Sequence, residues 1–159
     1  MKHLAEHLWL LAYDPDLTTE ARVKKAHTLW RKHGHAAVAS AGSISAMLLE
    51  QLAGSEAREH FTPARPPAEV MALLGDDAPA TAEETWNIIG GALLNHLDAV
   101  RDPFLSSQFE QVSHCHQGDA VFLSLWWGMR AIATLAKHDP DTFVARMQKV
   151  RSEVMGQQS

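Results

Sequence analysis

The densest group of side chains that could do chemistry is His114-Cys115-His116, with Glu110 one helical turn upstream. Imidazole, thiolate and carboxylate groups are the ligands that zinc takes from proteins. On a helix, His114 and His116 point about 200° apart, so only Glu110 and His114 share a face. A zinc site needs three or four ligands, so a histidine from another helix would have to complete this one. Zinc or another divalent metal is therefore one alternative for the segment.

Cys115 allows a further interpretation. The flanking histidines could stabilise its thiolate, which would make it the nucleophile of an enzyme. Cys115 also extends the apolar stripe of Phe109 and Val112, and free cysteine is among the most buried residue types. We therefore predict that Cys115 is buried and unreactive and that no cofactor is bound. A metal- or cysteine-dependent enzyme centred on these residues stays as the alternative: Glu110, His114, Cys115 and His116.

A basic segment at 22–35 could bind nucleic acid through its phosphates. It contains five Lys/Arg and three His without an acid, and the cations are Arg22, Lys24, Lys25, Arg31 and Lys32. The stretch 38–45 faintly resembles the turn of a helix-turn-helix motif. The recognition helix would then be 45–53, which offers no Arg, Lys or Asn to read base edges. We prefer a solvated basic face and keep a nucleic-acid-binding regulator as a second alternative.

A column of residues on the segment 120–138 combines residue types enriched at protein interfaces. Its members, one or two helical turns apart, are Leu123, Trp126, Arg130, Thr134 and Lys137. The opposite side of the same segment already has a complete apolar stripe, and one stripe suffices for an ordinary bundle helix. Tryptophan and arginine are the residues that most often anchor interfaces. The column is therefore expected to meet another helix of this chain or the surface of a partner.

Apolar residues at helical spacing predict the elements that must position these side chains. Two Asp-Pro pairs, Asp102-Pro103 and Asp139-Pro140, should begin helices, because Asp caps well and Pro suits the first turn. Thr81 and Glu84 form a capping-box pattern, which predicts a further helix start. The expected helices are 2–13, 18–34, 35–53, 68–74, 81–101, 104–114, 120–138 and a last one from Pro140. No stretch has the alternation of a strand.

Composition places the chain among folded globular proteins. Of its 159 residues 46% are hydrophobic and 21% are charged, near the usual globular averages of ~45–50% and ~25%. No apolar run approaches the ~20 residues that span a bilayer, so no membrane association is expected. A single cysteine cannot form an intramolecular disulfide, which favours a reducing compartment. We expect a cytoplasmic protein.

Charge is distributed unevenly along the chain. Residues 50–119 hold 12 acids and 3 Lys/Arg, whereas the remainder holds 7 acids and 11 Lys/Arg, so −9 and +4 sum to the net −5. Such asymmetry lets two parts of a fold, or two copies of a chain, attract each other. Both arrangements stay open from the sequence.

These observations predict an all-α single-domain helical bundle of about five long and two or three short helices. The domain should span 1–157, with 54–81 as a loop-rich connection within it. The leading interpretation of function is a non-catalytic, regulatory interaction protein that acts through a protein-protein surface as a homodimer, with itself or another protein as the partner. The enzyme and the nucleic-acid-binding regulator are the two alternatives.

Overall fold

The computed structural model describes residues 2–52, 66–95 and 97–157. The prediction of an all-α fold is confirmed, because the structure is 83% helical and has no strand among the described residues. The helices are α1 (Lys2–Tyr13), α2 (Thr19–His33), α3 (His35–Glu50), α5 (Ala68–Met71), α6 (Ala78–Asn95), α7 (Pro103–His138) and α8 (Pro140–Gln157). None of the described helices is long and apolar enough to cross a membrane.

The core is built around α3 and α7. Every residue of α3 from Ala37 to Ala46 is buried, and most of them are Ala, Ser or Gly, whose small side chains let another helix approach closely. At Gly42 a Cβ atom would overlap the ring of Phe109 on α7, so only glycine fits this crossing. The hydroxyl of Ser45 donates to the main-chain carbonyl of Ser124, 2.5 Å away, which satisfies a buried polar group. The helix-turn-helix resemblance of 38–45 is wrong, since this stretch is continuous buried helix.

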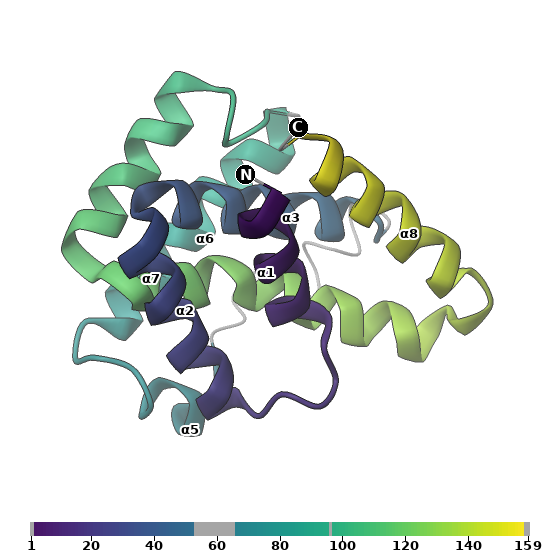
Figure 1. The fold of residues 1–159 in the computed structure, drawn as a ribbon, viewed down its shortest axis with the longest axis horizontal. Coiled ribbons are helices and arrows are strands. Elements are labelled where there is room, and N and C mark those ends of the chain that lie inside the picture. Colours follow the sequence, from purple (N-terminus) through teal and green to yellow (C-terminus); the bar gives the residue numbers. More distant parts are fainter. Residues whose placement is uncertain (1, 53–65, 96, 158–159) are drawn as a thin grey trace.

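Figure 1 shows α1 and α2 lying over α3 and the second half of α7, with α8 to one side. The predicted apolar face of α1 is buried: Leu4, Leu8 and Leu11 are at most 3% exposed. Tyr13 at the end of α1 stacks on Phe143 of α8, with ring centroids 6.2 Å apart. These contacts attach α1 to the core and to α8.

Local start and stop signals explain several helix ends. Thr18 caps α2 by accepting a hydrogen bond from the amide of Ala21, and Gly34 ends that helix with φ +63°. Asp102 caps α7 by accepting from two first-turn amides, with Pro103 in the first turn. Pro140 begins α8, as predicted.

The expected boundaries of α6 are wrong at both ends. The helix begins at Ala78, and the hydroxyl of Thr81 donates to the carbonyl of Asp77 instead of capping the helix. It ends at Asn95, well before the expected 101. Asp98 follows in the connection, where its carboxylate accepts hydrogen bonds from Ser43 and from the amide of Val100. These bonds fix a turn where the sequence suggested more helix.

The two helices expected at 104–114 and 120–138 are one element, α7, with a break. At Gln117 the backbone has φ 55° and ψ −129°, which is not helical, and the helix continues on either side. Gln117 is the one non-glycine residue with positive φ among the described residues. We call this position the helix break. It divides α7 into two halves that both contact α2, and the second half passes through the core.

Candidate functional site

The helix break is surrounded by polar contacts from other elements. The imidazole Nε2 of His27, on α2, lies 2.8 Å from Oδ1 of Asp119, just beyond the break. The other carboxylate oxygen of Asp119 accepts a hydrogen bond from the amide of Gly75, in the connection between α5 and α6. The carboxylate is thus satisfied on both oxygens, and its side chain is 15% exposed.

Gly118 is required at the break by close packing. A Cβ atom there would lie 2.6 Å from the Cα of His27 and would also overlap the imidazole ring. Three residues after His27 on α2, the indole of Trp30 donates to the hydroxyl of Ser113, which precedes the break, at 2.7 Å. Together these contacts fix α2 against α7 on both sides of the break. The His27 side chain stays 37% exposed.

The residues of the predicted metal or thiol site do not converge. Glu110 and His114 are exposed on the first half of α7, and His116 turns toward α6, where its Nε2 lies 3.5 Å from Glu84. In the described parts of the chain, no three His, Cys, Asp or Glu side chains gather in a way that could hold a metal ion. The prediction that Cys115 is buried is wrong, because the thiol is exposed.

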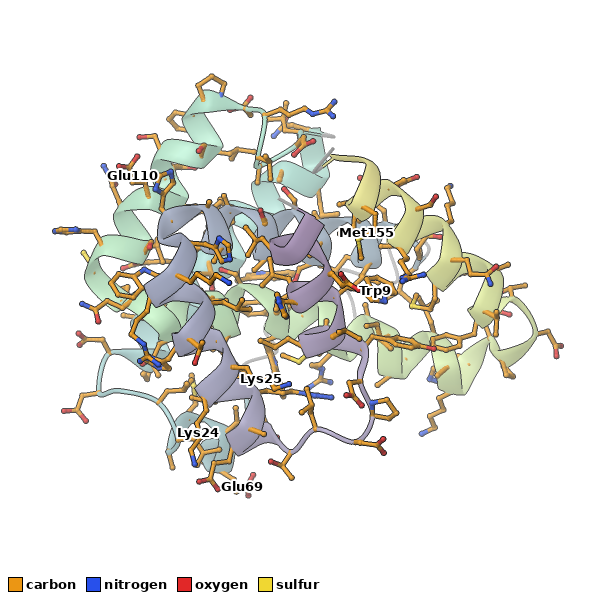
Figure 2. The ribbon with its side chains drawn as sticks, in the orientation of Figure 1. Trp9, Lys24, Lys25, Glu69, Glu110 and Met155 are labelled. Atoms are coloured by element: carbon orange, nitrogen blue, oxygen red, sulfur yellow. The ribbon has the colours of Figure 1, made fainter. Side chains whose placement is uncertain are left out.

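The basic segment forms much of the exposed surface of α2. Lys24, Lys25, Arg31 and Lys32 are exposed, and we call these four residues the α2 ridge. Figure 2 shows Lys24 and Lys25 along the part of α2 nearer to its start. The cations of the ridge therefore project from one helix that is anchored to α7 at its centre.

Arg22 does not belong to this surface, which corrects its assignment as a nucleic-acid contact. Its guanidinium donates to the main-chain carbonyls of Leu11 and Asp14, where it ties the end of α1 to α2. Burial lowers the pKa of Arg22 from its ordinary value, and the nearby Asp14 acts in the opposite direction. Arg22 is a structural residue.

The predicted interface column is divided by the structure. Leu123 is fully buried, so its assignment to a surface is wrong and it belongs to the core. Trp126, Arg130 and Thr134 are half-buried and Lys137 is exposed, and we call these four residues the α7 face. The indole Nε1 of Trp126 is buried without a hydrogen-bond partner, although the ring packs against Phe122 with centroids 6.2 Å apart. A buried donor without an acceptor costs about 1–3 kcal/mol, which calls for an explanation.

Sequence reasoning missed the pairing of His27 with Asp119 and the backbone of Gln117. The paired residues are 92 positions apart, and no local pattern joins them. A weak signal was present: Gly118 and Asp119 stand directly before the apolar segment 120–138, which marks a position where a helix could begin or bend.

Comparisons with known proteins give no further direction. No family model, no curated protein and no solved structure matches this chain.

Proposed function

We propose that this protein is a non-catalytic interaction protein that binds an acidic protein surface through the α7 face. The observation that carries the proposal is Trp126, a half-buried tryptophan on the same face of α7 as the cations Arg130 and Lys137. Tryptophan and arginine anchor interfaces because they bury a large area and can also form hydrogen bonds.

Charge supports a second copy of this chain as the partner. Residues 120–138 contain no acid, whereas residues 66–95 contain five acids and no Lys or Arg. All five acids are exposed: Glu69, Asp76, Asp77, Glu83 and Glu84. Each copy therefore offers the cationic α7 face and an acidic surface formed by residues 66–95. A two-fold axis would pair the α7 face of each copy with the acidic surface of the other in a closed dimer.

The proposed dimer is reversible rather than permanent. The accessible surface of 8311 Å² is close to the ~7,900 Å² that scaling with mass gives for a folded monomer of 17.5 kDa. Permanent dimers usually bury large apolar interfaces, whereas the α7 face offers one aromatic ring and two cations. Association through charges and one aromatic anchor is expected to be weakened by salt.

Sedimentation of the wild-type protein over a concentration series tests the proposal. A mass that rises from monomer to dimer, and falls again at high salt, is expected. The face variant, Arg130→Glu with Lys137→Glu, should stay monomeric, because it replaces two attractions with repulsions. The single variant Lys137→Glu changes only an exposed side chain, so it should weaken association without altering the melting temperature.

The matched control is the ridge variant, Lys25→Glu with Lys32→Glu, which makes the same change in net charge on α2. It should associate as the wild type does. Trp126→Ala should weaken association by ~30-fold or more, since anchor residues contribute ~2 kcal/mol or more. A wild-type mass that remains monomeric at hundreds of micromolar, or a ridge variant that dissociates as readily as the face variant, would show that the proposal is wrong.

A further inference from the structure

The α2 ridge is a second surface that the proposed function does not use. The chain has no Asp or Glu between residues 21 and 49, so no acid of α2 beyond Glu20, and none of α3 before Glu50, interrupts the ridge. Lys24 and Lys32 are eight residue steps apart, which is ~12 Å of helix at 1.5 Å per residue. Four exposed cations therefore share a short strip of surface.

Contacts within the chain leave most of this charge available. Lys24 lies 3.5 Å from Glu20, and both side chains are more than two-thirds exposed, so the pair is weak. Arg31 donates to the hydroxyl of Thr28 at 3.3 Å, which orients the guanidinium without neutralising it. Asp119, the acid that faces α2 from α7, is held by His27 and by the amide of Gly75. Both oxygens of this carboxylate are therefore already hydrogen-bonded.

The anchoring of α2 makes the ridge a rigid surface. Trp30 and His27 hold one side of the helix against α7, and Val23, Ala26 and Leu29 are buried in the core. Side chains that project from a fixed helix keep a constant spacing, so binding loses less conformational entropy than binding by a flexible basic tail. His27 is partly exposed, and its Nε2 is engaged with Asp119.

We propose that the α2 ridge binds the phosphodiester backbone of a nucleic acid. One strand presents a negative charge about every 3.4 Å of helix axis, so ~12 Å of ridge meets about three phosphates. Lysine and arginine are the residues that contact phosphate, and arginine can do so with two hydrogen bonds. The proposed contacts are to phosphates, which carry no sequence information, so we expect binding that is independent of base sequence.

Fluorescence anisotropy with a labelled 20-nucleotide probe tests this proposal, first as a duplex of mixed sequence and then as one of its single strands. Three phosphate contacts predict a slope of about −2.7 in log K against log salt for the duplex, which is about a 40-fold loss between 50 and 200 mM KCl. The single strand should give a slope of about −2. The probe with the higher affinity at the same KCl concentration is the better partner.

The same two double variants serve here with their roles exchanged. The ridge variant, Lys25→Glu with Lys32→Glu, should lower duplex affinity at least tenfold at 50 mM KCl and reduce the slope by about 1.8, because two contacts are lost. The face variant should bind the probe as the wild type does. Since each variant tests one surface and controls for the other, failure of this proposal is distinguishable from failure of the proposed dimer.

Three results would overturn the proposal. The first is no binding of either probe at 50 mM KCl. The second is loss of binding in the face variant rather than the ridge variant, which would place the polyanion on α7. The third is displacement of the probe by poly-glutamate at equal charge concentration, which would make an acidic protein the partner of the ridge.

Discussion

Replacing Gln117 by glycine is expected to stabilise the protein, although glycine within a helix normally destabilises it. At φ 55° and ψ −129° a Cβ atom crowds the neighbouring peptide groups, and such conformations cost about 1–3 kcal/mol in a non-glycine residue. Glycine removes this cost but loses ~0.5–1 kcal/mol through the greater freedom of the unfolded chain. The difference is a gain of about 1 kcal/mol. The side chain of Gln117 is exposed, so few contacts are lost.

The assay is thermal unfolding followed by circular dichroism. In a protein of this length, 1 kcal/mol corresponds to a change in Tm of ~2–4 °C, so Gln117→Gly should raise Tm by about that amount. Gln111→Gly is the matched control, because Gln111 is an exposed glutamine inside the same helix. It should lower Tm by ~1–4 °C, since helical glycine costs ~0.5–1 kcal/mol.

The central expectation is that Tm rises in Gln117→Gly and falls in Gln111→Gly. Gln117→Ala should give no increase in Tm, because alanine retains the Cβ atom that causes the strain. If Gln117→Gly lowers Tm as Gln111→Gly does, the break at Gln117 is not strained. The explanation of α7 as two half-helices held by their neighbours would then be refuted.

Three other predictions concern the same region and its surroundings. Gly118→Ala should destabilise the protein by ~1–3 kcal/mol, because the new methyl group overlaps His27; an unchanged Tm would contradict this packing. Cys115 should react quickly with Ellman's reagent in the native protein, because the thiol is exposed; slow reaction before denaturation would contradict that exposure. Burial, followed by the charges of Lys32 and His7, lowers the pKa of His33 from its ordinary 6.5. The unfolded chain therefore binds more protons, so stability should be lost as pH falls below about 6.5, and His33→Gln should reduce the Tm difference between about pH 7.5 and pH 5.5.

Local signals predicted the helices whose ends depend on local chemistry. Thr18 and Gly34 delimit α2 because a hydroxyl cap and a positive φ need only their own neighbours. The prediction that Thr81 caps a helix start was wrong for a related reason. A threonine three residues before a glutamate also fits the first turns of a helix that has already begun, and the buried hydroxyl of Thr81 bonds the carbonyl of Asp77.

The error at Cys115 is one of helical phase. At 100° per residue, Cys115 lies ~120° around the helix from Phe109, whereas His116 lies only ~20° from it. The structure follows this arithmetic, since Cys115 is exposed and the side chain of His116 is only 10% exposed. The apolar stripe of Phe109 and Val112 therefore continues through His116 rather than Cys115. The contact of His27 with Asp119 has no comparable rule, because it depends on how α2 packs against α7.

The break also explains how one helix contributes to two surfaces. A straight helix of 36 residues would be ~54 Å long, whereas a 159-residue domain has a radius of gyration of ~15 Å, or ~39 Å across as a sphere. An unbroken α7 would extend beyond the core and expose part of its apolar stripe. With the break, Phe109 before it and Leu123 after it are both fully buried. Burial of this kind stabilises by ~1.5–3 kcal/mol per large side chain, which offsets the strain at Gln117. Residues on both sides of the break can then hold the α2 ridge in place while the second half presents the α7 face.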